Sequence, residues 1–238
     1  MLFDLDDTLF AHRRAVEAGV LAQRSEHGGA FALADDAAEL HRWTQLEELH
    51  YHRYLSGELD FLEQRRERAR GFVAPYGLDL TDDRAADTWF DAYLEKYRDA
   101  WTLLPDALPC LDELRRRIPG VRFGVITNGE RAFQTAKMDT VGLSEHIEHV
   151  IASGDAGFAK PDPRIFLLAC GVFGVTPASA VYVGDRLRTD AIGARDAGLT
   201  GIWLDRPDHA PPEAPEDPAD PGVPRIRSLA ELPRLLAP

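Results

Sequence analysis

Short apolar runs alternate with segments of helical period along the second half of the chain. Apolar runs bounded by polar residues or glycine predict buried strands, and apolar positions spaced three and four apart predict helices. The predicted strands are 121–126, 149–152, 180–183, 201–204 and 225–227. The predicted helices are 106–118, 130–141, 162–173, 189–197 and 229–236. Such alternation predicts an α/β fold with a doubly wound parallel sheet, a Rossmann-like core with right-handed crossovers.

The first half of the chain has a different pattern. Between residues 12 and 100 the apolar positions keep a helical period and strand-like runs are almost absent. The predicted helices are 13–27, 34–55, 59–72 and 82–97, and Gly28 and Gly29 are expected to stop the first of them. We therefore predict two domains, a core formed by residues 1–11 and 101–238 and an all-helical cap at 12–100. Residues 206–224, rich in Pro, Asp, Glu and Ala, are predicted to form an exposed loop.

The chain opens with MLFDLDDTLF, a short apolar run that carries two aspartates. Alternation along an extended backbone places Asp4 and Asp6 on one side. Two like charges at a buried strand need a reason such as a cation or a chemical task, and the other interpretation is that they cap the next turn. Only three residues precede Asp4, so either the strand is short or the native chain begins upstream.

Three later segments carry polar residues at comparable places. Thr127 and Asn128 follow an apolar run, Lys160 precedes a proline, and Asp185 and Asp190 follow the predicted strand at 180–183. Because the carboxyl ends of parallel strands meet at one edge of a sheet, these side chains are expected to share a site there. Taken alone, each has an ordinary alternative: a TNG turn, an exposed lysine, or, for Asp190, a helix N-cap.

Together the four segments resemble the four motifs of the haloacid dehalogenase superfamily, specifically its phosphatase branch with a helical cap inserted after the first motif. The resemblance implies that Asp4 is a nucleophile that forms an aspartyl phosphate. It implies that Asp6 is the general acid that protonates the leaving group and then the base that activates water. It covers the core almost end to end, whereas the cap matches only in being helical and inserted at that point.

The resemblance also implies roles for the other motif residues. Thr127 matches the donor of a hydrogen bond to the phosphoryl oxygens, assisted by the backbone N–H groups of Asn128 and Gly129. Lys160 matches the cation that offsets negative charge on the nucleophile and the phosphate. These four residues are thus the expected substrate-binding groups.

A divalent cation is the cofactor that the resemblance implies. It assigns Asp185 as a ligand, Asp190 as a ligand directly or through water, and the carboxylate of Asp4 and backbone carbonyl of Asp6 as further ligands. Hard oxygen ligands suit Mg²⁺. Electrostatics makes a similar demand, because two carboxylates ~4 Å apart repel by roughly 4 kcal/mol at an effective dielectric constant of 20.

Composition narrows the class of partner. The chain has 40 acidic and 27 basic residues and a net charge of −13, which argues against a nucleic-acid partner. Cys110 and Cys170 are too few for a disulfide framework and are predicted to be buried thiols in a reducing compartment. No signal peptide and no membrane span are predicted, so we expect a cytoplasmic monomer or homodimer with no membrane partner.

The expected function is that of a magnesium-dependent phosphatase acting on a small phosphorylated metabolite. A phosphosugar mutase, a haloacid dehalogenase and a non-catalytic phosphometabolite-binding protein are the alternatives, and the presence of Asp6 counts against the dehalogenase. Substrate selection is assigned to the cap, with Tyr51, Arg53 and Arg65 as candidate contacts. His12 either faces the cavity or lies on the surface of the hinge.

Overall fold

The computed structural model of the chain describes residues 1–207 and 222–236. Contacts divide the chain into two compact units. One is formed by Met1–His12 with Thr102–Pro238 and is called the sheet unit below; the other, Arg13–Trp101, is called the helical unit. Most of the loop predicted at 206–224, residues 208–221, lies outside the described residues.

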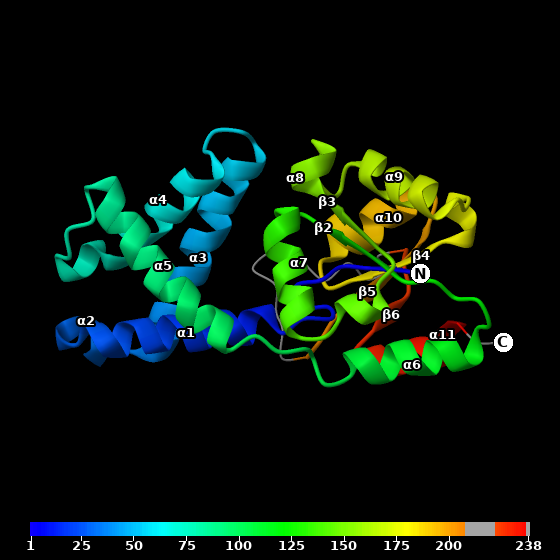
Figure 1. The fold of residues 1–238 in the computed structure, drawn as a ribbon, viewed down its shortest axis with the longest axis horizontal. Coiled ribbons are helices and arrows are strands. Elements are labelled where there is room, and N and C mark those ends of the chain that lie inside the picture. Colours follow the sequence, from blue (N-terminus) through cyan, green and yellow to red (C-terminus); the bar gives the residue numbers. More distant parts are fainter. Residues whose placement is uncertain (208–221, 237–238) are drawn as a thin grey trace. The chain divides into compact units, whose positions relative to one another are not determined.

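The sheet unit is built on a six-stranded sheet in which every paired strand is parallel (Figure 1). The spatial order is β3-β2-β1-β4-β5-β6, so the chain moves outward in opposite directions on the two sides of β1 and β4. The strands are β1 (Leu2–Phe3), β2 (Gly124–Thr127), β3 (His149–Ala152), β4 (Val181–Gly184), β5 (Thr200–Leu204) and β6 (Arg225–Ile226). This topology confirms the predicted α/β fold class and creates a switch in strand order between β1 and β4.

Helices cover both faces of this sheet. Figure 1 shows α9 (Pro163–Phe173) and α10 (Gly193–Asp196) on one face and α6 (Ala107–Arg117) and α11 (Leu232–Leu236) on the opposite one. Helix α7 (Arg131–Thr140) corresponds to the helix predicted at 130–141, whereas the short α8 (Ser153–Ala156) was not predicted from the sequence pattern. The two helix layers account for the nearly continuous burial of the central strands.

The apolar core beneath α9 also prepares the site. The ring of Phe166 packs edge-on against the ring of Tyr182, with centroids 5.1 Å apart, and both side chains are fully buried. Burying a large apolar side chain stabilises the fold by roughly 1.5 to 3 kcal/mol. The ring of Tyr182 is therefore fixed in the core, while its hydroxyl reaches the strand ends. Close packing on this side of the sheet also requires a glycine at position 124, because a Cβ there would lie 2.6 Å from the ring of Phe173.

Strand β1 is shorter than the usual strand and leads into a tight turn. After Phe3 the backbone stays paired for one more residue, with the N–H of Asp4 donating to the carbonyl of Val183 at 2.8 Å. The carbonyl of Leu5 then accepts the N–H groups of three residues that follow it. Asp7 takes the left-handed conformation (φ 59°), which Asp tolerates better than most residues. The alternation argument therefore stops applying before Asp6.

The helical unit contains α1 to α5. Their bounds are α1 (His12–His27), α2 (Gly29–Leu33), α3 (Asp36–Leu55), α4 (Phe61–Val73) and α5 (Asp83–Asp99). Asp35, Asp60 and Asp82 cap the last three, each accepting backbone N–H groups of the first turn. The unit's core is aromatic, with the Trp43 ring centroid 4.9 Å from that of Phe72.

Helix α2 was not predicted, because its stabilising contact is tertiary. Gly28 and Gly29 end α1 as expected, with positive φ at both residues. The side chain of Arg24, only 1% exposed, then donates to the carbonyls of Phe31 and Ala34 beyond the turn. A buried guanidinium that requires acceptors thus holds this short segment in helical form.

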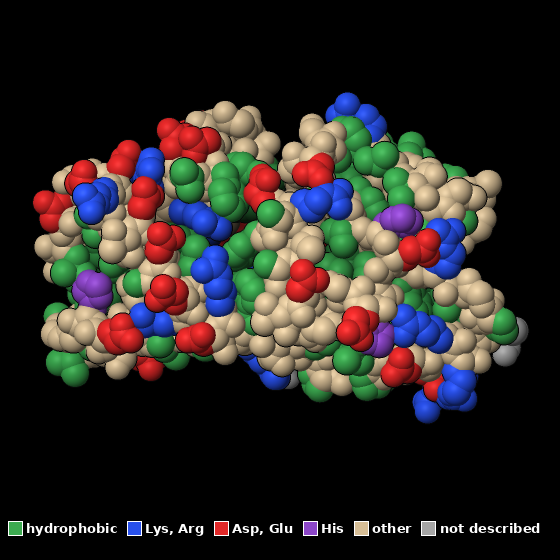
Figure 2. Space-filling view, viewed as in Figure 1, with side chains coloured by type: hydrophobic (Ala, Val, Ile, Leu, Met, Phe, Trp, Pro, Cys, Tyr) green, Lys and Arg blue, Asp and Glu red, His purple; other side chains and the backbone are tan. Residues whose placement is uncertain are grey.

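The surface and the helix lengths bear on partners. Figure 2 shows acidic and basic side chains interspersed over the face of the molecule that it presents. Among the described residues, no helix combines the length and apolar character needed to cross a membrane.

Candidate active site

The predicted site residues of the sheet unit come together at the carboxyl ends of three adjacent strands. Asp4 follows β1, Thr127 ends β2, and Asp185 follows β4, and these strands are neighbours in the order β2-β1-β4. Lys160 lies just before α9 and Asp190 lies in a π-helical segment, Leu187–Ile192, that precedes α10. The switch in strand order is thus where the polar residues of all four motifs converge.

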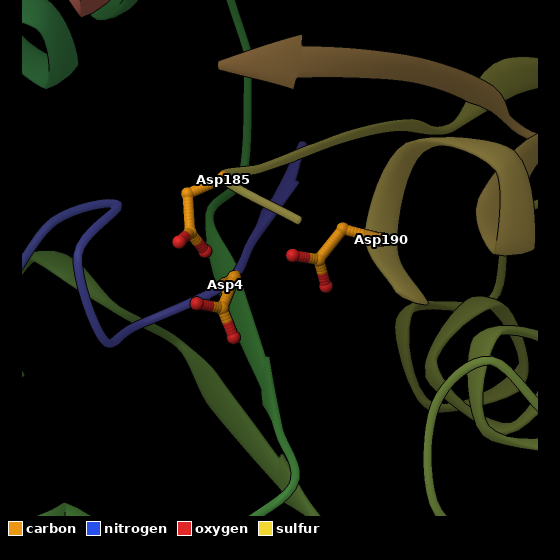
Figure 3. A group of neighbouring side chains, drawn as sticks. All are labelled: Asp4, Asp185 and Asp190. Atoms are coloured by element: carbon orange, nitrogen blue, oxygen red, sulfur yellow. The ribbon is translucent and has the colours of Figure 1, made fainter. Parts of the chain in front are cut away.

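Three of the carboxylates form a compact acidic cluster. Asp4, Asp185 and Asp190 each offer an oxygen such that all three atoms lie within 4.8 Å of one another. Figure 3 shows the three side chains close together and reaching the same region from three separate segments. Burial and the neighbouring carboxylates raise the pKa of Asp4 and of Asp185 above the ordinary range, although Lys160 opposes the rise at Asp4. Because the ionised forms of these carboxylates are unfavourable so close together, the site favours bound protons or a bound cation.

Lys160 is the counter-charge to this cluster. Its Nζ lies 2.6 Å from Asp4 Oδ1, 2.7 Å from Asp190 Oδ1 and 2.8 Å from the hydroxyl of Tyr182. The side chain is 3% exposed. Burial alone would lower its pKa, but the charges of Asp190 and Asp4 raise the pKa above its usual value. The ammonium is therefore a fixed positive charge beside Asp4.

Asn128 holds Lys160 in place through the backbone. Its Oδ1 accepts the N–H of Lys160 at 2.7 Å, and its Nδ2 donates to the carbonyl of Lys160 at 2.9 Å. Sequence reasoning assigned only the backbone N–H of Asn128 to the site. The paired side-chain bonds show that it also joins the loop after β2 to the residue before α9.

Asp190 is fixed inside its segment and is not a helix N-cap. The N–H groups of Asp190 and Ala191 both donate to the carbonyl of Arg186, which widens the turn into a π-helix. Asp190 Oδ2 accepts the N–H of Arg186 at 3.0 Å, while Oδ1 serves Lys160 and Tyr182. Gly184 is required here, because a Cβ at that position would lie 2.4 Å from the carboxyl group.

The acidic cluster has the chemistry of a site for a hard divalent cation. Its donors are all carboxylate oxygens, which such ions prefer. Asp185 is partly exposed, and within the described residues its carboxylate accepts no hydrogen bond. Its backbone is anchored by Trp203, whose Nε1 donates to the Asp185 carbonyl at 3.0 Å. A carboxylate held in place, without donors and next to two others, fits a metal ligand.

Asp6 has partners of its own. Lys137 Nζ lies 2.7 Å from Oδ1, Gln134 Nε2 lies 2.9 Å from Oδ2, and His12 Nδ1 lies 3.8 Å from Oδ1. Burial alone would raise the pKa of Asp6, but the charges of Lys137 and His12 bring it below the ordinary value. Asp6 is therefore a carboxylate in the resting structure, whereas burial and neighbouring carboxylates raise the pKa of Asp4.

Sequence reasoning missed Gln134, Lys137 and Tyr182. Gln134 and Lys137 lie three positions apart on α7, the helix that follows β2. A lysine on the buried face of a predicted helix was the available signal, because a buried ammonium needs an anionic partner. Tyr182 carried no signal, since a tyrosine in an apolar strand is ordinary.

The candidate contacts in the helical unit have partners within that unit. Arg53 pairs with Glu58, and Tyr51 packs against another tyrosine ring. The guanidinium of Arg65 lies 4.1 Å from the ring centroid of Phe61. Burial and the charge of a neighbouring arginine lower the pKa of Arg65 to about 10. That these residues select the substrate stays a prediction.

Comparison with known proteins identifies the family. The model of the haloacid dehalogenase-like hydrolases matches residues 1–198. The chain is 42% identical to the phosphoserine phosphatase of Thermus thermophilus over 109 residues, 46% of this chain and 43% of that protein. It is 31% identical to the glyceraldehyde 3-phosphate phosphatase of Methanopyrus kandleri over 214 residues, 87% of this chain and 83% of that one. The match therefore spans less than half of the phosphoserine phosphatase and most of the glyceraldehyde 3-phosphate phosphatase.

A solved structure shows the same fold over nearly the whole chain. The 2-haloacid dehalogenase of Pseudomonas syringae superimposes with a TM-score of 0.65 and 26% sequence identity, covering 99% of this chain and 96% of that one. The predicted resemblance is confirmed by these matches. Because the family model covers residues 1–198 of the 238, this chain belongs to the haloacid dehalogenase-like hydrolases.

Proposed function

We propose that this protein is a magnesium-dependent phosphatase that hydrolyses a small phosphorylated metabolite through an aspartyl phosphate on Asp4. The observation that carries the proposal is the different setting of the two aspartates that follow β1. Asp4 lies in the acidic cluster against Lys160, whereas Asp6 is held apart by Lys137 and Gln134. Two carboxylates in contrasting environments suit one to act as nucleophile and the other as acid and base.

The proposed reaction has two displacements at phosphorus. In the first, Asp4 attacks, the bond to the ester oxygen breaks, and Asp6 gives that oxygen a proton so that an alcohol leaves. In the second, water attacks the aspartyl phosphate, Asp6 accepts its proton, and the bond to Asp4 breaks to release inorganic phosphate. Dividing the hydrolysis in this way replaces one difficult step with two easier ones.

Asp6 starts this sequence as a carboxylate, which suits the second step directly. Its role as acid in the first step needs a higher pKa than the resting structure gives it. The negative charge of an incoming phosphoryl group beside Asp6 acts in that direction, because a like charge favours the protonated form. Substrate binding thus favours the uptake of a proton by Asp6 from solvent water, and this proton is the one that Asp6 gives to the leaving oxygen in the first step.

The remaining site residues offset and orient the phosphoryl charge. Lys160 supplies a buried positive charge next to Asp4, and the hydroxyl of Thr127 with the N–H of Asn128 supplies donors at the end of β2. The N–H of Gly129, also predicted as a donor to the phosphoryl group, donates to Thr127 Oγ1 at 3.3 Å in the resting structure. A bound Mg²⁺ would be held by Asp4, Asp185, Asp190 and the carbonyl of Asp6, and it would supply positive charge that screens the carboxylates from the phosphate. The three carboxylate oxygens of the acidic cluster, which lie within 4.8 Å of one another, support this assignment.

Adding Mg²⁺ to chelated protein is expected to raise the melting temperature, with the larger rise at pH 8 than at pH 5. Because the folded chain raises the pKa of Asp4 and Asp185 above the ordinary value of 3.8, their contribution to stability is complete below that pH. It is lost as the pH rises through the raised values and the carboxylates ionise together. An ion at 100 times its dissociation constant adds about 2.7 kcal/mol. Differential scanning fluorimetry measures the shift.

The matched control for that measurement is Asp185→Asn, which removes a proposed ligand and one negative charge. It should melt at or above the wild-type temperature in chelator and respond little to Mg²⁺. Equal Mg²⁺ responses in the wild type and this variant would place the ion elsewhere.

The function itself is tested by phosphate release from a panel of phosphorylated metabolites, with Mg²⁺ and after exhaustive chelation. The panel includes phosphoserine and glyceraldehyde 3-phosphate, the substrates named for two relatives. We expect turnover with Mg²⁺ and none without it. Full activity after chelation would contradict the metal assignment.

Two further assays separate the alternatives. Halide release from 2-chloropropionate, with no phosphate release from any ester, would make the protein a dehalogenase, the activity of the Pseudomonas syringae neighbour. Conversion of a sugar phosphate to its positional isomer faster than phosphate release would make it a mutase.

A further inference from the structure

A single buried glutamine joins two groups of the proposed active site. Gln134 of α7 is 3% exposed. Its Nε2 lies 2.9 Å from Asp6 Oδ2 and 2.6 Å from Thr127 Oγ1. An amide nitrogen carries two N–H groups, so both donors of Gln134 are committed, one to the proposed acid and base and one to the proposed phosphoryl donor.

The contacts of Asp6 fix which way this amide is oriented. Lys137 Nζ lies 2.7 Å from Asp6 Oδ1 in an ion pair, and Gln134 Nε2 lies 2.9 Å from Oδ2. A carboxylate only accepts hydrogen bonds, so the amide must present its nitrogen to Asp6 and not its oxygen. The same nitrogen faces Thr127, and the threonine oxygen is therefore an acceptor toward Gln134.

This orientation determines where the threonine hydroxyl points. Thr127 Oγ1 also accepts the N–H of Gly129 at 3.3 Å. A hydroxyl oxygen has two lone pairs and one hydrogen, and the two donors occupy both lone pairs. The hydrogen must be directed away from Gln134 and Gly129. At the end of β2, a phosphoryl oxygen is the acceptor that the proposed reaction brings.

Packing does not account for a glutamine at this position. Gln134 Oε1 is buried and has no hydrogen-bond partner in the described structure. An unpaired buried carbonyl oxygen costs stability, and a methionine of similar length would avoid that cost. The loop after β2 nevertheless packs closely against this side chain, since a Cβ at Gly129 would lie only 2.9 Å from Gln134 Cγ. What a glutamine provides here, and a methionine would not, is the pair of hydrogen bonds to Asp6 and Thr127.

Lys137, on the same helix as Gln134, binds the other carboxylate oxygen of Asp6. Its side chain is 2% exposed, and its Nζ lies 5.0 Å from the ring centroid of Phe10 and 5.2 Å from that of Phe133. Aromatic rings on a buried ammonium restrict where it can move. Both oxygens of Asp6 are therefore held from α7, one by Lys137 and one by Gln134.

We propose that Gln134 is a positioning residue that, together with Lys137, sets the rotamer of Asp6 and turns the hydroxyl hydrogen of Thr127 toward the phosphoryl group. This inference rests on the proposed phosphatase function. Gln134 touches neither phosphorus nor the leaving group; it acts through the two groups that do. A misplacement of either group lowers the rate without abolishing binding.

The test compares Gln134→Met with wild type on an alkyl phosphate and an aryl phosphate. The methionine keeps the volume and removes both hydrogen bonds. We expect kcat/KM to fall about 10²-fold on the alkyl ester, where the acid matters most, and about tenfold on the aryl ester, where only the loss at Thr127 is felt. KM should change little on either. Asp6→Asn provides the reference for complete loss of the acid and should show the same substrate order.

Gln23→Met is the matched control. Gln23 is also 3% exposed and donates to a backbone carbonyl, that of Trp89 at 3.3 Å, within the helical unit. The melting temperature of Gln134→Met should fall no further than that of this control. Unchanged kcat/KM in Gln134→Met would overturn the proposal. Equal losses on both esters together with a larger fall in melting temperature would also overturn it, because that is the result of a structural role.

Orthovanadate separates this inference from the proposed function. If wild type releases no phosphate from any ester, the phosphatase proposal fails, and the position of the Thr127 hydroxyl is then tested by binding alone. Vanadate with Mg²⁺ should raise the melting temperature of wild type, and Gln134→Met should need about tenfold more vanadate for the same shift. Identical vanadate titrations of the two proteins would overturn the positioning role.

Discussion

Asp4→Asn is expected to reduce phosphate release by at least about 10⁴-fold while leaving the fold intact. An amide has nearly the shape of a carboxylate but is a poor nucleophile, so no aspartyl phosphate forms. The fold survives because Lys160 keeps two of its contacts, to Asp190 and the hydroxyl of Tyr182. Phosphate release on the best panel substrate measures the loss, and circular dichroism monitors the fold.

The stability of this variant carries a second, independent expectation. Burial and neighbouring carboxylates raise the pKa of Asp4 in wild type, so its ionised form is unfavourable near neutral pH without a cation. Removing that charge should leave the melting temperature in chelator at pH 8 equal to or above that of wild type. A lower melting temperature would show that the main role of Asp4 is to stabilise the fold as the partner of Lys160.

Asp196→Asn is the matched control for the activity measurement. Asp196 belongs to the same unit, is 61% exposed and forms an ion pair with the neighbouring Arg195. It should keep wild-type turnover, since exposed pairs contribute little. Substantial phosphate release by folded Asp4→Asn would remove Asp4 from the nucleophile role.

The residues that sequence predicted are those whose chemistry conflicts with their surroundings. Asp4 and Asp185 stand out because a carboxylate at the end of an apolar strand is costly without a task. The fold followed from the same reasoning, since alternating strands and helices leave few arrangements other than a parallel sheet. The sequence therefore identifies the charged residues whose burial requires a partner or a catalytic task.

The supporting residues could not be found in this way. Gln134 and Tyr182 are unremarkable in a helix and a strand, and their importance arises only when tertiary packing brings them to Asp6 and Lys160. The side chain of Asn128 acts across a gap of 32 residues that no local pattern encodes. Elements with tertiary causes were missed for the same reason, as Arg24 and α2 show.

Lys160→Met is expected to lower the free energy of unfolding in chelator by about 3 to 5 kcal/mol at pH 8, and to remove most activity. The ammonium is the buried partner of both Asp4 and Asp190, whose side chains are 11% and 1% exposed. Without it, two neighbouring carboxylates lose their counter-charge in a place that water hardly reaches. Equilibrium urea unfolding measures the change. Lys96→Met is the control, because its partner Glu26 is 71% exposed and can be solvated.

The pH dependence of this loss distinguishes charge from packing. Removing Lys160 takes away the charge that lowers the pKa of Asp4, so the folded-state pKa rises further above the unfolded value. Stability is then present at low pH, where the carboxyl groups are protonated, and is lost as the pH rises through the raised value. The deficit should be small at pH 5 and large at pH 8. Combining Lys160→Met with Asp190→Asn should recover part of the loss at pH 8, since one buried charge is gone. A deficit that is the same at both pH values, and unrelieved in the double variant, would mean that the lysine stabilises the fold through the packing of its methylene chain and not as the counter-charge of the acidic cluster.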